Sequence, residues 1–324
     1  MSDANTLSTA GGAKPASRPA IHRVRAVVNP LSGSVEPGAA DALRAILDAH
    51  GLDAVVEDVQ PQDIERALKD AVEAKPDLLI LLAGDGTASL AATLCGPDGP
   101  LLAPLAGGTM NMLPHAVYGP IPWKDGLAKA LESGVERMIS GGEVDGRRFY
   151  VAAILGAPAL WAPAREAVRK GQLKLALLRG QRALKRAFTG NLRFCLDGGV
   201  RSKTEALTLM CPLVSKGLNR DDVLEASALD PKDAGEAIRL GAHMLFGDWR
   251  NDPSVQVQTC RSGRVWQRGT IHAVLDGEPQ RFGDSASLRF VPAAFRALAL
   301  DLTAAVPDQP KSKTGAQSAA AEAV

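Results

Sequence analysis

The chain has 324 residues, 46% of them hydrophobic, so it can bury a sizeable core, and its length favours two domains over one. Its net charge of +1 and its 4% of aromatic residues lack the basic and aromatic pattern of a nucleic-acid-binding surface. The cysteines are too scattered for a zinc site, and no apolar run approaches the roughly 18 residues of a membrane span. We therefore expect a cytoplasmic protein with no nucleic-acid partner.

In chain order, the first part of the sequence alternates between expected strands and helices. Residues 1–21 are rich in Ser, Ala, Gly and Thr and are expected to be a disordered lead-in. Strands are expected at residues 24–28, 53–59, 78–83 and 101–105, and helices at 37–50, 62–74 and 123–131. This alternation predicts a doubly wound parallel sheet in a domain spanning residues 22–141.

Three of these strands end at small turns that contain glycine. The turns read Asn29-Pro30-Leu31-Ser32-Gly33, Gly84-Asp85-Gly86-Thr87 and Gly108-Thr109-Met110-Asn111. In a parallel sheet they share the carboxyl edge, where ligands bind. Glycines let backbone N–H groups approach an anion, and the following helix adds its positive dipole end. One such turn alone could be an ordinary helix start with a capping threonine, but the repetition favours a phosphate site.

Beyond residue 141 the pattern changes to short β-compatible runs. They cover residues 148–154, 192–196, 206–211, 255–259 and 270–275. Gly, Asp and Pro between the runs predict a β-rich, sandwich-like domain over residues 142–303, followed by a flexible tail at 304–324.

One basic segment interrupts the β-rich pattern. Between Arg165 and Arg193 the chain carries nine Lys or Arg and one acid, Glu166. An amphipathic helix here could lie on an anionic membrane surface. Alternatively, it could pack on the second domain with a solvated basic face.

The three turns, in this order and spacing, resemble the nucleotide-site motifs of the diacylglycerol kinase catalytic domain family, which includes bacterial lipid kinases and sphingosine kinases. The resemblance covers residues 24–143 and continues in Leu275-Asp276-Gly277-Glu278-Pro279, which is similar to that family's C-terminal acidic motif. It implies a first domain like that of NAD kinases and phosphofructokinases, with ATP and Mg²⁺ bound. The nucleotide-binding residues implied are Asn29, Pro30, Ser32, Gly33, Gly84, Asp85, Gly86, Thr87, Gly108, Thr109 and Asn111.

Several carboxylates are candidates for phosphoryl-transfer chemistry. Asp85, between two glycines, is placed to hold magnesium directly or through water. The resemblance implies that Glu278 is the general base, with Asp276 and then Asp85 as the other candidates. Asp276 with the glycine after it is also a strong hairpin signal, so a surface turn is the alternative. Asp222 resembles a structural magnesium ligand of the family, although Val223 follows it where glycine is usual, and a plain loop is the alternative.

The sequence departs from the family pattern at three places. Ala83 stands where the usual Gly-Gly-Asp-Gly-Thr motif begins, and Leu90 replaces an acid that usually follows the motif. Residues 152–162, where the family commonly has an acidic residue, contain no carboxylate.

The function expected from the resemblance is that of an ATP-dependent lipid kinase that phosphorylates a hydroxyl of a diacylglycerol-like or sphingoid lipid. We expect peripheral contact with the inner membrane face through the segment between Arg165 and Arg193. Two alternatives remain. One is a soluble small-molecule kinase, such as an NAD kinase. The other is a non-catalytic nucleotide-binding regulator, which would explain Ala83 and Leu90.

Overall fold

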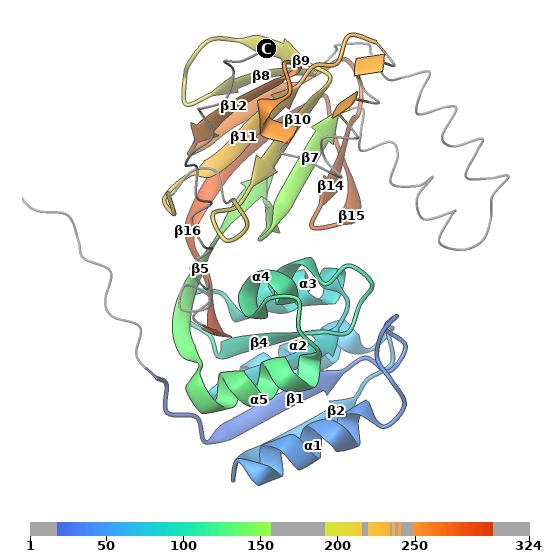
Figure 1. Ribbon diagram of the computed structural model, residues 1–324, viewed down its shortest axis with the longest axis vertical. Coiled ribbons are helices and arrows are strands. Elements are labelled where there is room, and N and C mark those ends of the chain that lie inside the picture. The colour runs from blue at the N-terminus through green and yellow to red at the C-terminus, as the bar shows by residue number, and fades with distance from the viewer. Residues whose placement is uncertain are drawn as a thin grey trace, which may run out of the picture.

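The computed structural model describes residues 18–156, 192–215, 220–233, 235–236, 239–240 and 249–300. These residues form an α/β lobe and a β-rich lobe joined by two long strands (Figure 1). The expected fold class, a parallel α/β domain followed by an antiparallel β-rich region, is confirmed. Residues 1–17 of the expected lead-in, the whole expected tail and most of the basic segment lie outside the described residues.

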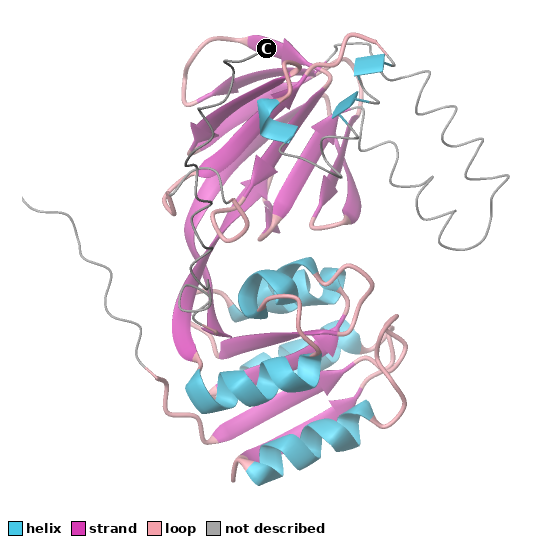
Figure 2. Ribbon diagram, in the orientation of Figure 1, coloured by secondary structure: helices cyan, strands magenta, loops and turns pink. Residues whose placement is uncertain are grey.

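The α/β lobe is built on four parallel strands in the order β2-β1-β3-β4. Their bounds are β1 Arg23–Val28, β2 Asp53–Asp58, β3 Leu78–Ala83 and β4 Leu101–Ala106. The helices are α1 Ala39–Ala49, α2 Ile64–Glu73, α3 Asp85–Cys95, α4 Met112–Tyr118 and α5 Trp123–Ser133. They cover both faces of the sheet, with α3 and α4 on one side and α1 and α5 on the other (Figure 2).

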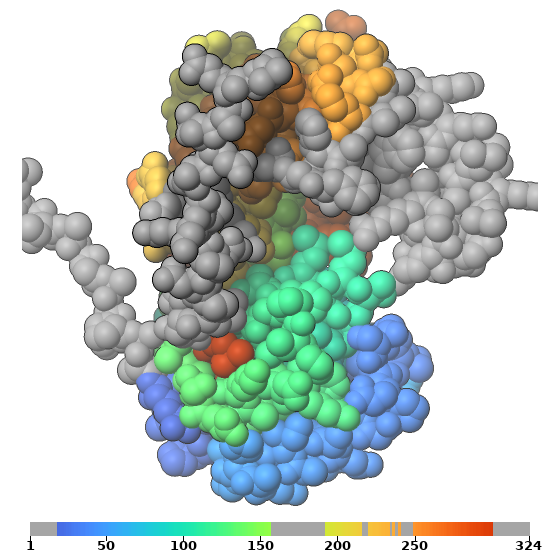
Figure 3. Space-filling model, in the orientation of Figure 1, coloured from blue at the N-terminus to red at the C-terminus, as the bar shows by residue number. Residues whose placement is uncertain are grey.

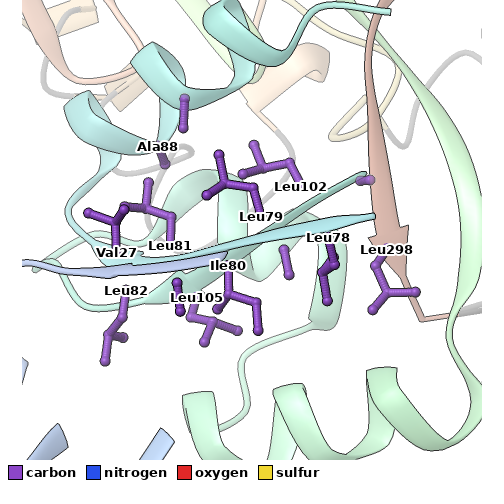
Figure 4. Close-up of a cluster of buried hydrophobic side chains, with 14 of the residues drawn as sticks. Val27, Leu78, Leu79, Ile80, Leu81, Leu82, Ala88, Leu102, Leu105 and Leu298 are labelled. Carbon is purple, nitrogen blue, oxygen red and sulfur yellow. The ribbon is translucent and has the colours of Figure 1, made fainter. Parts of the chain in front are cut away.

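Strand β3 is the centre of this lobe's core. All six of its residues are buried, as expected of a strand whose two faces are both covered by helices. Leu79 and Leu81 point toward the side of α3, while Ile80 and Leu82 point to the opposite side (Figure 4). The continuous apolar run of β3 therefore packs against both helical layers and fixes where the strand ends.

Two long antiparallel strands, β5 (Val135–Val144) and β16 (Ser285–Ala299), link the lobes (Figure 1). One end of β16 pairs with β4 through Ala297 and Leu102, and the other end pairs with β13 (Ser262–Trp266). Figure 3 shows the red end of β16 beside the green residues of the α/β lobe. The chain thus returns to the first lobe after leaving it, so the boundary near residue 141 stays a proposal.

The β-rich lobe pairs an extension of the first sheet with a second, six-stranded antiparallel sheet of order β12-β11-β10-β7-β14-β15. The second sheet comprises β7 Ala152–Gly156, β10 Ala206–Met210, β11 Leu224–Leu229, β12 Val255–Cys260, β14 Ile271–Leu275 and β15 Glu278–Phe282. The remaining elements are β6 Arg147–Phe149, β8 Leu192–Leu196, β9 Ser202–Thr204 and a 3-10 turn at Trp249–Asn251. Side chains from both sheets, such as Phe194 and Phe282, form one apolar core.

Because Leu298 of β16 lies in the core of the α/β lobe, Leu298→Ala should reduce the free energy of unfolding by about 2–5 kcal/mol. The matched control is Met138→Ala on the neighbouring strand β5, whose side chain is 45% exposed and should cost less than about 0.5 kcal/mol. Urea denaturation of both variants measures the difference. Equal losses would mean that the end of β16 is not part of this core.

Candidate active site

The three glycine-containing turns meet at the carboxyl ends of β1, β3 and β4, as the sequence predicts. The backbone N–H of Ser34 donates to the carbonyl of Gly107 at 3.1 Å, and its hydroxyl donates to the carbonyl of Gly108 at 2.8 Å. A Cβ on Gly108 would lie only 2.8 Å from the Cα of Gly84. This close approach requires glycine at position 108 and sets the turns after β3 and β4 against each other.

Two asparagines expected to contact a nucleotide also stabilise their own turns. The Oδ1 of Asn29 accepts a hydrogen bond from the N–H of Leu31 at 3.1 Å. Asn111 has a φ of 51°, accepts from the N–H of Gly108 at 2.7 Å and donates to its carbonyl at 3.0 Å. Side-chain bonds of this kind stabilise tight turns. The sequence pattern located these residues but not this structural role.

The other predicted nucleotide-site residues border the same edge of the sheet. The N–H of Ser32 donates to the carbonyl of Asn29 at 3.1 Å, which closes the turn that contains Pro30. A Cβ on Gly33 would lie 3.1 Å from the hydroxyl of Thr109, so the first and third turns also touch. Thr87 lies in the first turn of α3.

Asp85 is the first residue of α3, and its side chain contacts the start of α4. Its Oδ1 accepts a hydrogen bond from the N–H of Leu113 at 3.4 Å. Burial raises the pKa of Asp85, and backbone hydrogen bonds from residues 111–113 partly oppose that rise. The carboxylate is thus half-buried at the junction of two turns, and its ionised form is destabilised there by the loss of contact with water.

Asp276 and Gly277 form the two-residue turn between β14 and β15, with φ angles of 46° and 88°. Both angles are positive, which matches the preference of Asp-Gly for this type of hairpin turn. The hairpin alternative is therefore correct in geometry. The turn is nevertheless not a free surface loop, because it faces α3 of the other lobe through the hydroxyl of Ser89.

The side chain of Asp276 is 3% exposed and fully hydrogen-bonded. It accepts bonds from the backbone N–H groups of residues 150–152 at 2.7–3.0 Å and from the hydroxyl of Ser89 at 3.0 Å. Burial raises the pKa of Asp276, and these donors lower it in part. The four acceptor sites of a carboxylate are then filled, which argues against Asp276 as the base.

Glu278 begins β15 and extends its carboxylate over the start of α3. A Cβ on Gly86 would lie 2.9 Å from its Oε1. The residue is exposed, and its carboxylate makes no hydrogen bond or ion pair with any other described residue. A helix N-terminus attracts anions through unsatisfied N–H groups and the helix dipole. Of the three candidate carboxylates, Glu278 is the one whose oxygens are open to a substrate.

The second predicted metal ligand, Asp222, is engaged by arginines. Its carboxylate forms ion pairs with Arg220 and Arg261, and these guanidinium groups lower the pKa of Asp222 to about 2. Within the described residues, no group of three or more His, Cys, Asp or Glu side chains could hold a metal ion. The surroundings of Asp222 do not fit a magnesium ion, and we place none there.

Comparison with known proteins confirms the resemblance noted in the motifs. Residues 23–144 match the family model of the diacylglycerol kinase catalytic domain. A protein of Bacillus anthracis str. Sterne, provisionally named a diacylglycerol kinase, is 16% identical with a TM-score of 0.68, over 87% of this chain and 98% of that one. A diacylglycerol kinase structure from the same organism is 14% identical with a TM-score of 0.63, over the same shares. No curated protein matches the sequence.

The raised pKa of Asp85 predicts a stability cost at neutral pH. Because its folded-state pKa lies above its unfolded-state value, the ionised carboxylate destabilises the native state at pH 7. Asp85→Asn should therefore raise the melting temperature at pH 7. The gain should shrink as pH falls through the raised pKa toward about 3.9, the ordinary value for Asp. The control is Asp70→Asn on the exposed side of α2, which should change neither the melting temperature at pH 7 nor its dependence on pH. A lower melting temperature for Asp85→Asn at pH 7 would contradict this account.

Proposed function

We propose that this protein is an ATP-dependent lipid kinase that transfers the γ-phosphoryl group to a hydroxyl of a diacylglycerol-like or sphingoid lipid. One observation supports this above the others. The carboxylate of Glu278, from the β-rich lobe, lies over Gly86 at the start of α3, in the α/β lobe. An anion-binding helix terminus and an open proton acceptor are thus brought together from the two lobes.

The turns after β1, β3 and β4 are the proposed phosphate site. The start of α3 offers backbone N–H groups and the positive end of the helix dipole to phosphate oxygens. Thr87 and Thr109 add hydroxyl groups at the same edge. Backbone contacts to phosphate do not select a base, so the turns alone cannot identify the nucleotide. The match to the diacylglycerol kinase catalytic domain supports ATP.

Magnesium fits the residues at this site. Mg²⁺ is commonly held by one or two carboxylates together with substrate phosphates and water, so a cluster of three acids is not needed. Glu278 and a phosphate would share the start of α3, and two anions there repel each other unless a cation neutralises them. We assign Asp85 as the carboxylate that would hold the ion. When bound, it would neutralise charge on the transferred phosphoryl group.

Glu278 is the proposed general base. Its carboxylate takes the proton of the acceptor hydroxyl as that oxygen bonds to the γ-phosphorus. The bond from the γ-phosphorus to the bridging oxygen breaks, and its electron pair stays on that oxygen as ADP leaves. Asp85, bonded at the start of α4, keeps the first turn of α3 in place for this step.

A lipid acceptor is supported by the motifs rather than by a binding pocket. Asn29 with Pro30, and the turn from Gly108 to Asn111, follow the lipid-kinase pattern. None of the described helices is long and apolar enough to span a bilayer. We propose peripheral contact with the inner membrane face, with the segment between Arg165 and Arg193 as the contact.

The test is transfer of labelled γ-phosphate from ATP, with magnesium, to diacylglycerol and sphingoid bases in mixed micelles, with NAD as a soluble acceptor. We expect labelled lipid and a loss in kcat of about 10²–10⁴-fold for Glu278→Gln. Glu132→Gln, an exposed acid on α5, is the control and should keep full activity. Labelled NAD without labelled lipid would favour the soluble kinase. Nucleotide binding without any transfer would favour the regulator.

Gly86→Ala tests the contact that carries the proposal. The added methyl group would lie 2.9 Å from Oε1 of Glu278 and displace this carboxylate while leaving both backbones intact. We expect kcat to fall at least about tenfold, because the base is moved from its productive position. In a Glu278→Gln background the same substitution should have little further effect. Losses that multiply in the double variant would show that Gly86 acts independently of Glu278.

A further inference from the structure

We propose that Ser89 is a positioning residue that, through Asp276, fixes Glu278 over the start of α3. The inference rests on the proposed function, in which Glu278 is the base. It assigns a role to a side chain that does not touch the reacting atoms.

Ser89 connects two segments that are far apart in sequence. Its hydroxyl donates to Oδ2 of Asp276 at 3.0 Å, across a separation of 187 residues. Ser89 follows Asp85 by four residues, so the two share one face of α3. The helix that begins at the proposed phosphate site therefore also binds the hairpin that carries Glu278.

Ser89 is the donor on α3 among the four groups that bond to Asp276. The other three are backbone N–H groups of residues 150–152, which lead into β7 in the same sheet as the hairpin. A buried carboxylate is costly unless donors surround it, and a bond to a charged group is stronger than one to a neutral group. The hydroxyl of Ser89 thus ties the hairpin tip to α3, whereas the backbone donors tie it to its own sheet.

The strands β5 and β16 that connect the lobes do not by themselves fix the distance between the hairpin and α3. Their pairing shifts register between Val291 and Phe295, and such irregularities bend paired strands. A second hydroxyl of α3 supports the tie, since the hydroxyls of Thr93 and Tyr150 lie 2.7 Å apart. Bonds from α3 therefore set the distance between hairpin and helix that the bent strands leave open.

Asp276 transmits this position to Glu278 through a very short path. Only Gly277 separates them, and the turn is anchored by the bonds to Asp276. Displacement of Asp276 would therefore also move Glu278. Such a shift affects the chemical step more than nucleotide binding, because the phosphate turns belong to the other lobe.

The experiment compares Ser89→Ala with Ser89→Thr, which keeps the hydroxyl. Ser133→Ala is the matched control, since this helix serine also makes one hydrogen bond, to the carbonyl of Lys129 at 3.0 Å. We expect Ser89→Ala to lower kcat about tenfold, the factor typical of one hydrogen bond to a charged group, while KM for ATP changes less than about twofold. Ser89→Thr should restore most of kcat. In a Glu278→Gln background Ser89→Ala should have no further effect.

Hydrogen exchange of the amides of residues 150–152 gives a second readout that needs no activity. Ser89→Ala should speed their exchange, and Ser133→Ala should not. If the wild-type protein transfers no phosphoryl group, the proposed function fails, and exchange alone decides whether Ser89 fixes the hairpin. Unchanged kcat together with unchanged exchange would overturn the inference. An equal loss of kcat from Ser89→Ala in the wild-type and in the Glu278→Gln background would also overturn it.

Discussion

A carboxylate removed from water must be surrounded by hydrogen-bond donors, and in this protein the buried Asp276 imposes that requirement. Its donors come from residues 150–152 and from Ser89 on α3, so three distant segments must converge before the charge is satisfied. The convergence places the β14–β15 hairpin against the helix that starts at the glycine turns. The candidate site therefore exists only when both lobes are folded and in contact.

The path of the chain makes the lobes interdependent for a second reason. Strand β16 crosses from the β-rich lobe to pair with β4, and Leu298 fills the core around β3. The hydroxyl of Tyr118 on α4 donates to the carbonyl of Leu298 at 2.9 Å, deep in that core. Residues near both ends of the described chain thus contribute to the core of the α/β lobe.

Local patterns were enough to predict the strands β1 to β4, the helices α1, α2 and α5 and the three turns, because glycine placement and apolar runs act over a few residues. The Asp-Gly hairpin could be predicted from the sequence for the same reason. Local patterns did not predict the long strands β5 and β16, which pair across a large separation in sequence. The Ser89 contact could not be predicted either, since nothing local links residues 187 positions apart. Two of the three departures from the family pattern have packing explanations that only the fold reveals. Ala83 is buried at the end of β3, and Leu90 packs against the core where an acid would be unfavourable.

Helix α3 combines these functions within its first two turns. Its backbone N–H groups face the glycine turns, Asp85 bonds to the start of α4, and Gly86 leaves room for Glu278. Ser89, one turn later, bonds to the hairpin that carries that same glutamate. Because a helix is stiff over this length, the proposed phosphate site and the proposed base are both positioned by one rigid element. A change in the angle between the lobes would therefore alter the distance between Glu278 and the glycine turns, which lie in different lobes.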